Sequence, residues 1–237
     1  MRDDRFVQPL YTFAQAARFI GMHQATLATW TRPPRCRQTS PGGGRGHTAV
    51  VTALPPEPGD LRRIPFIGLI EATVVEAFRR TGLSLQRIRR ALTVLAEQGE
   101  LEHALASEHL FTDGAEVLYD YAASNEELQI RLLTLTEVST GQRVFHEVIL
   151  DYLRRIEFTD GWATGLILPI TERPLLRVVP EVAGGTPLFM EGGAPLSVVR
   201  SRFVAGEPVE SIAADYEVPA AHITESLNAI WPTFEAA

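Results

Sequence analysis

The side chains best suited to chemistry in this sequence lie close to its N-terminus. They are cations that can neutralise phosphate and small polar groups that can hydrogen-bond to the edges of bases. These candidate DNA-binding residues are Arg18, Gln24, Thr26, Thr29, Arg32, Arg35, Arg37 and Arg45. The chemistry that they predict is non-covalent recognition of double-stranded DNA.

The distribution of charge along the chain supports this prediction. The 237-residue sequence has 22 basic residues, all of them arginine, and 29 acidic residues, for a net charge of −7. Up to Arg63 there are nine arginines and four acidic residues, or +5, whereas from Ile64 onward there are 13 arginines and 25 acidic residues, or −12. A positive segment attracts phosphate and an acidic one is repelled by it. We therefore expect DNA at the N-terminal end and a protein partner along the remainder.

No group of residues has the composition of a catalytic or metal site. The six histidines fall in different predicted elements without an HxxxH pair, and one cysteine cannot make a cysteine-rich zinc site. The glycines at 42–46 lack the Lys-Ser/Thr pair of a phosphate-binding loop. The acidic run at Glu97, Glu100 and Glu102 is typical of a solvated helix end. We expect no catalytic residues, no metal and no cofactor.

The single cysteine and the absence of a long apolar run also bear on location. Cys36 cannot form an internal disulfide, as is usual in a reducing compartment. No apolar run approaches the roughly 18 residues that a membrane helix needs, and the first residues lack the apolar stretch of a secretory signal. These features predict a cytoplasmic protein without membrane contact.

Residues 11–31 have the pattern of two short helices separated by a turn. Thr12 followed by Gln15 is a capping-box signature, and Gly21 suits the left-handed conformation that ends a helix. Inward-facing apolar residues recur at helical spacing, at Phe13, Ala16, Ala17, Ile20, Leu27 and Trp30. The outward positions of the second helix are then Gln24, Ala25, Ala28 and Thr29. A major groove accepts such a helix, although a helical hairpin that only packs would give the same pattern.

Residues 32–63 predict a β-hairpin wing. Its tip would be the glycine-rich stretch at 42–46, and a β-branched run from Thr48 to Thr52 follows. Arg45 would there reach a phosphate or a narrow minor groove. A surface loop without DNA contact is the alternative for this segment. Two further helices are predicted, one from Pro65 to near Gly82 and one from a Ser84 cap to Gly99.

Two segments of this region resemble the MerR-type winged-helix regulators. They are YTFAQAARFIGMHQATLATW and GLSLQRIRRAL, and the resemblance covers about the first 100 residues. It implies a DNA-binding domain at 1–100. Ala28 stands where such proteins often have arginine, so Arg18, Arg32 and Arg45 are expected to supply the phosphate contacts.

Residues 101–175 predict an acidic region of mixed α and β structure. Asp113-Gly114 and Asp160-Gly161 are two-residue hairpin signals, and 142–156 has helical periodicity. Residues 101–127 contain seven acidic residues and no arginine, which favours self-association or binding of another protein over DNA.

Residues 176–237 predict a C-terminal module of three helices. Two glycine turns, at 184–185 and 192–193, precede a helix ending at Ala205, a helix opened by Pro208, a turn at 217–219 and a last helix. The last two helices carry five acidic residues and no arginine, so phosphate would be repelled there. Together with the preceding regions this predicts an α+β fold, mainly helical. Its parts are a winged helix-turn-helix, a mixed middle with β-hairpins and a three-helix module.

The C-terminal module resembles a small bacterial domain family of uncharacterised function. The positions that match its pattern are Pro180, Gly185, Pro187, Gly193, Pro195, Gly206, Glu207, Ile212, Ala213, Tyr216 and Val218. Ala194 departs from the pattern, where the family often has Thr-Arg. A MerR-like head joined to this domain resembles the VapB-type antitoxins of toxin–antitoxin systems.

That resemblance implies a homodimeric autorepressor whose partners are operator DNA and a PIN-domain ribonuclease toxin, an enzyme that holds Mg²⁺ with clustered acidic residues. Such antitoxins often block the toxin's pocket with arginine. The candidate toxin-binding residues are Arg154, Arg155, Trp162, Arg173 and Arg177. A ligand-sensing regulator without a toxin, whose middle region binds a small molecule, is the alternative function.

Overall fold

The computed structural model describes residues 4–32, 49–89, 92, 103–108, 151–152 and 154–231. Several predictions fall outside these residues and are not addressed by the structure. They are the candidate contacts Arg35, Arg37 and Arg45, the glycine-rich tip, the hairpin at Asp113-Gly114, and most of the helices predicted at 84–99 and 142–156.

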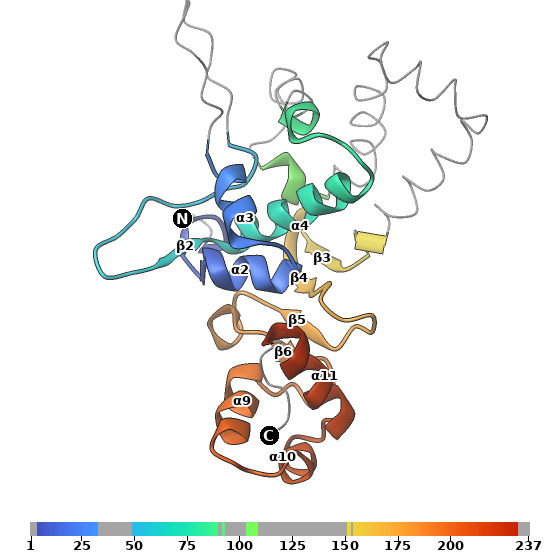
Figure 1. Cartoon of the computed structure of the whole chain (residues 1–237). Coiled ribbons are helices and arrows are strands. Elements are labelled where there is room, and N and C mark those ends of the chain that lie inside the picture. Colours follow the sequence, from blue (N-terminus) through green and yellow to red (C-terminus); the bar gives the residue numbers. More distant parts are fainter. Residues whose placement is uncertain are drawn as a thin grey trace, which may run out of the picture.

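The N-terminal part is a helix-turn-helix held on a short two-stranded sheet. After α1 (Asp4–Val7), the strand β1 (Tyr11–Thr12) leads directly into α2 (Phe13–Ile20), and α3 (Gln24–Trp30) follows after a three-residue turn. β1 pairs antiparallel with β2 (Arg62–Ile64), with Tyr11 opposite Ile64. Figure 1 shows α2 and α3 beside the long helix α4 (Phe66–Arg80).

Helix α4 is the centre of the hydrophobic core. Twelve of its 15 residues are buried, so it is enclosed on every side rather than along one stripe. It packs against α1, α2, β2, β4 and the 3-10 turn η1 (Ala104–Ala106). Residues 85–89 begin a second helix, where the hydroxyl of Ser84 accepts a hydrogen bond from the backbone N–H of Arg87 at 3.3 Å. The predicted Ser84 cap is therefore confirmed.

A four-stranded antiparallel sheet follows, in the order β3-β4-β5-β6. Its strands are β3 (Ile156–Thr159), β4 (Trp162–Ile167), β5 (Leu176–Val178) and β6 (Leu188–Phe189). The turn between β3 and β4 has Asp160 at φ +53° and Gly161 at φ +81°, which confirms the predicted Asp-Gly hairpin. The sheet continues across residue 175, where the sequence suggests a boundary between the middle region and the C-terminal module.

Three helices complete the chain after the 3-10 turn η3 (Ala183–Gly185). They are α9 (Leu196–Val204), α10 (Val209–Tyr216) and α11 (Ala220–Ile230). Proline precedes each of them, and Glu217 at φ +54° ends α10 before the next helix. In Figure 1 the sheet lies between the N-terminal helices and this C-terminal group. The predicted class, α+β with a helix-turn-helix and a C-terminal three-helix module, is confirmed.

The described helices do not include one that is both long and apolar enough to cross a membrane.

Candidate nucleic-acid interface

The first helix of the pair begins and ends as its sequence predicts. The backbone N–H of Thr12 donates to Gln15 Oε1 at 2.9 Å, and the N–H of Gln15 donates to Thr12 Oγ1 at 3.1 Å, which is a complete capping box. At the other end Gly21 adopts φ +76°, and the N–H of Met22 donates to the carbonyl of Ala17 at 2.9 Å. Both helix ends are fixed by local hydrogen bonds, so the turn presents α3 at a defined angle.

Helix α3 leaves a polar face open to solvent. Leu27 and Trp30 are buried against the core, and the exposed residues are Gln24, Ala25, Thr26 and Thr29. Ala28, expected to face outward, is half-buried. The Thr29 hydroxyl donates to the carbonyl of Thr26 at 2.7 Å, so it can only accept a hydrogen bond from a base. Gln24 retains both a donor and an acceptor for a base edge.

The far end of α3 is held by an arginine that the sequence pattern did not single out. Arg89 Nη2 donates to the carbonyl of Arg32 at 3.0 Å and lies 3.4 Å from that of Thr29. A cation at the C-terminus of a helix compensates both the helix dipole and the unpaired carbonyls. The only sequence signal was its place in GLSLQRIRRAL, the segment that resembles the MerR-type regulators.

Within the described part of the wing region, residues 49–63, the chain forms a hairpin, while the predicted glycine-rich tip lies outside the described residues. The N–H of Leu54 donates to the carbonyl of Arg63 at 2.7 Å, and the chain reverses between Glu57 and Asp60. On the returning strand the exposed Arg62 forms an ion pair with Asp60 at 2.8 Å. The hydrogen bond from Arg62 lowers the pKa of the Asp60 carboxyl below its usual range. Arg62 is therefore an additional candidate phosphate contact, although phosphate would compete with Asp60.

The β-branched run that follows the glycines does not form the expected strand over residues 49–52. Instead, the N–H groups of Val50 and Val51 both donate to the carbonyl of Trp30, at 3.1 and 3.3 Å. The N–H of Thr52 donates to the buried carboxylate of Glu71 at 2.5 Å. Burial of the two valines and this bond to α4 outweigh strand pairing, so the segment is anchored directly beneath α3.

Arg18 and Arg32, the described arginines among the predicted DNA contacts, are both exposed. Arg32 directly follows α3. Arg18 lies near the end of α2, with its guanidinium 5.9 Å from the centre of the Trp231 ring in the C-terminal module. An open groove is lined by Met22, His23 and Gln24 on one side and by Ala229, Ile230 and Trp231 on the other. The C-terminal module therefore borders the start of α3.

The candidate toxin-binding residues occupy two ends of the sheet. Ile167 pairs with Arg177, and its N–H donates to the carbonyl of Arg155 at 2.7 Å, so these three residues lie side by side on one face. Arg173 lies in the turn before β5. Trp162 is at the opposite end of β4, edge-on to the ring of Phe6 at 5.1 Å between centroids. Arg155 and Arg177 therefore flank Ile167 on one face of the sheet, and Trp162 is separate from them.

The partners of these arginines differ. Arg154 and Arg173 are exposed, and Arg155 is 3.8 Å from Asp151. Arg177 is half-buried, and its Nε is a buried atom without a hydrogen-bond partner in the described part of the chain. A buried, unpaired donor is costly, so of these four arginines Arg177 has the most to gain from an added acceptor.

The C-terminal helices carry two arginines, Arg200 and Arg202, and the second is held in ion pairs. Arg202 is bound to Glu207 and, at 2.5 Å, to Asp215, and these hydrogen bonds raise its pKa further above its usual range. No cluster of three or more potential metal ligands occurs among the residues that the structure describes.

Comparisons with known proteins agree with the geometry. The family model described as "Putative DNA-binding HTH domain" matches residues 9–92. "Putative antitoxin VapB45" of Mycobacterium tuberculosis is 37% identical over 232 residues, which cover 95% of each chain. The crystal structure of Rv2018 from Mycobacterium tuberculosis is similar with a TM-score of 0.70 at 32% identity, covering 94% of this chain and 99% of that one. The N-terminal helix-turn-helix is thus of a DNA-binding type, and the chain belongs to the antitoxin family that includes VapB45.

Proposed function

We propose that this protein is an antitoxin that neutralises a cognate PIN-domain ribonuclease and represses its own operon by binding operator DNA as a homodimer. The observation that carries the DNA part is the exposed polar face of α3, held by the capping box before it and by Arg89 after it. A base-reading helix has to be fixed in this way, because contacts to base edges tolerate little displacement.

The positions of the charges suggest how DNA lies. Arg18 precedes α3 and Arg32 follows it, so phosphates on the two sides of a groove would meet a cation at each end of the helix. The exposed Arg62 on β2 adds a third candidate. A symmetric dimer would read an inverted repeat whose half-sites are about 34 Å apart, or a multiple of that distance.

The antitoxin part is supported by the similarity to VapB45, which extends over nearly the whole chain, and by the arginines on the sheet. A PIN toxin of the kind implied by the resemblance gathers carboxylates around Mg²⁺. A guanidinium placed among them makes charge-assisted hydrogen bonds and competes with the metal. We assign this role to Arg177, because its Nε is unpaired in the described structure and Ile167 beside it offers an apolar contact.

Co-expression with the product of the adjacent gene tests the toxin part. We expect a stoichiometric complex by native mass spectrometry that lacks the ribonuclease activity of the free toxin. A protein that purifies alone, and that never rescues cells expressing that neighbour, would contradict the antitoxin proposal.

Two matched substitutions test the inhibitory surface. Arg177→Gln should weaken toxin binding tenfold or more, because truncating one partner of a buried charge pair costs about 2–5 kcal/mol. Arg154→Gln removes the same charge from an exposed position and should have a smaller effect, since exposed ion pairs contribute about 0–1 kcal/mol. Operator binding should be unchanged in both variants. Equal effects on toxin binding would remove Arg177 from the proposed role.

Base reading is tested at Gln24. Gln24→Ala should change the preferred operator sequence, measured by selection from a randomised DNA pool, because a bidentate amide contact discriminates by about 1–3 kcal/mol. An unchanged preference profile would exclude Gln24 from the base-reading residues.

A further inference from the structure

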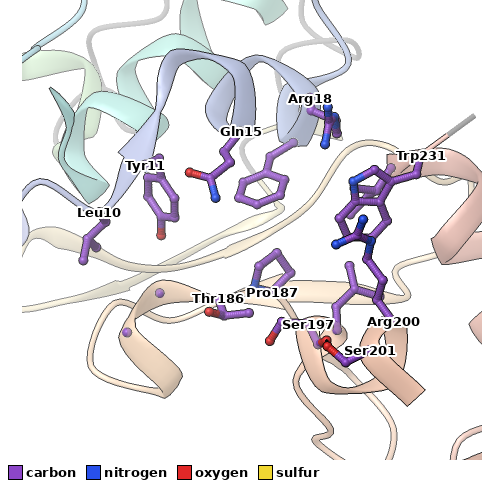
Figure 2. A pocket seen from close by; sticks show the side chains of 15 residues that line it. Leu10, Tyr11, Gln15, Arg18, Thr186, Pro187, Ser197, Arg200, Ser201 and Trp231 are labelled. Atoms are coloured by element: carbon purple, nitrogen blue, oxygen red, sulfur yellow. The ribbon is translucent and has the colours of Figure 1, made fainter. Parts of the chain in front are cut away.

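A cavity of about 380 Å³ lies between the helix-turn-helix and the C-terminal module. One wall comes from β1 and α2, and the other from the turn at 184–187, α9 and the end of α11. Figure 2 shows side chains from both walls facing each other across it. Its volume is within the range of sites for small organic ligands. It is separate from the exposed face of α3 and from the arginines on the sheet.

The cavity contains a polar group that lacks a partner. Tyr11 is only 3% exposed, and its hydroxyl is buried without a hydrogen bond to any residue that the structure describes. The hydroxyl points toward the Gly184–Thr186 turn at the cavity's edge (Figure 2). A buried hydroxyl without a partner costs about 1–3 kcal/mol, which an acceptor supplied from the cavity would recover.

Two arginines supply positive charge to the lining, which also includes the uncharged polar residues Gln15, Thr186, Ser197 and Ser201. Arg18 and Arg200 both lie over the ring of Trp231, with their guanidinium carbons 5.9 and 4.6 Å from its centre. The capping box uses Gln15 Oε1, so the part of that amide left for a ligand is its NH₂ group. None of the lining residues within the described part of the chain is acidic, although the whole sequence carries a net charge of −7.

Apolar residues complete the lining, among them Leu10, Phe19, Pro187 and Ile230. Two guanidinium groups, an indole face and an unpaired hydroxyl beside apolar side chains suit a ligand with one negative group and an apolar body. We infer that the cavity binds a small organic carboxylate. The carboxylate meets Arg18 and Arg200, and the ligand bridges the DNA-binding head and the C-terminal module.

Such a ligand links two parts of the chain that both contact it. Helix α3 follows α2 directly, so a carboxylate bound against α2 stabilises one placement of α3 relative to α11. If the DNA-bound and DNA-free states of the protein bind the carboxylate with different affinity, the carboxylate changes the affinity for operator DNA. This inference requires neither the toxin nor autorepression, so its failure would leave the proposed function intact.

The test uses the full-length protein and two acid–amide pairs: benzoate with benzamide, and indole-3-acetate with indole-3-acetamide. Each amide keeps the shape of its acid and removes the charge. Isothermal titration calorimetry should show saturable binding of at least one acid, with its amide at least tenfold weaker. If neither acid binds at millimolar concentration, or if the amides bind equally well, the inference is wrong.

Variants localise the site. Arg200→Gln should weaken binding of the acid about tenfold, because a hydrogen bond to the charged group is lost. Tyr11→Phe should weaken binding by a smaller factor, because the carboxylate is assigned to Arg18 and Arg200 and the hydroxyl meets an uncharged part of the ligand. The matched control is Arg79→Gln, which removes an exposed arginine from α4 outside the cavity and should bind as the unmodified protein does. Equal weakening by Arg200→Gln and Arg79→Gln would indicate unspecific attraction and overturn the inference.

A second matched pair uses the glycine turn. Gly184 and Gly185 both have positive φ, so alanine is strained at either position. A Cβ on Gly185 would lie 2.6 Å from the Tyr11 hydroxyl, whereas one on Gly184 meets no atom within 4 Å. Gly185→Ala should therefore weaken binding of the acid more than Gly184→Ala does. Identical affinities in these two variants, together with unchanged binding by Tyr11→Phe, would place the ligand elsewhere.

Discussion

Substitution of Gly68 tests how the segment after the glycine-rich region is anchored. Gly68 lies inside α4, where alanine is normally favoured by about 1 kcal/mol over glycine. At this position, however, a Cβ would overlap the backbone carbonyl oxygen of Thr52. Thr52 cannot simply move away, because its N–H is bound to the buried carboxylate of Glu71 at 2.5 Å. The clash and the helix propensity therefore oppose each other.

The magnitude follows from these terms. Overpacking costs about 1–3 kcal/mol, and weakening a hydrogen bond to a charged group costs part of a further 1.5–3 kcal/mol. After the gain in helix propensity is subtracted, Gly68→Ala should lose about 2 kcal/mol of stability. For a chain of this size each kcal/mol lowers Tm by about 2–4 °C, so calorimetry should show a fall of about 4–8 °C.

Gly165→Ala is the matched control. A Cβ there would also overlap an oxygen, but that oxygen belongs to the carboxylate of the exposed Glu157, which can rotate into solvent. The free energy of unfolding of this variant should stay within about 1 kcal/mol of that of the unmodified protein, since alanine is also favoured over glycine inside a strand. If Gly68→Ala is as stable as the unmodified protein, or if Gly165→Ala loses equally, the contact between Thr52 and α4 does not have the rigidity assigned to it.

Three other perturbations address the interface and the cavity. Arg89→Met keeps the side-chain length but removes the hydrogen bond to the carbonyl of Arg32 at the end of α3. It should lower the free energy of unfolding by about 1 kcal/mol, measured by thermal unfolding, and weaken binding to all DNA sequences alike. A change in affinity confined to one sequence would contradict this role. Arg32→Gln should reduce the slope of log K against log salt by about 0.9 in titrations of duplex DNA, whereas an unchanged slope would show that Arg32 does not contact phosphate. Burial raises the pKa of the Tyr11 phenol well above its usual range, so the folded protein keeps it protonated while the unfolded chain ionises near pH 10, and stability should fall as pH rises above about 10. Urea unfolding between pH 8 and 11 should show a smaller loss of stability for Tyr11→Phe than for the unmodified protein. Equal losses would refute the assignment of this pH dependence to Tyr11.

The local elements of this fold could be predicted because their signals are local. The Thr12 and Gln15 cap, the left-handed Gly21 and the Asp160-Gly161 turn each follow from the conformational limits of a few adjacent residues. The same holds for the prolines that precede the C-terminal helices. These features specify where helices and turns begin and end, without information on what they pack against.

What the sequence did not predict depends on contacts between distant segments. Arg89 reaches the end of α3 from 57 positions away in the chain, and no spacing rule connects the two. Val50 and Val51 have strand-forming side chains, but bonds to Trp30 and burial against the core decide their conformation. The cavity arises only when α2 meets the C-terminal module, so the unpaired state of Tyr11 has no counterpart in the sequence pattern.

The all-round burial of α4 limits how this protein can be divided. The helix-turn-helix family model ends at residue 92, which suggests a portable DNA-binding unit. Yet α4 contacts β4 and η1 as well as α1, α2 and β2, so cutting the chain after residue 92 would expose apolar side chains to water. Such a fragment should aggregate, or bind another protein that covers the exposed side chains of α4. Recombination that exchanges the N-terminal helix-turn-helix between proteins of this architecture would also have to transfer the sheet that packs against α4.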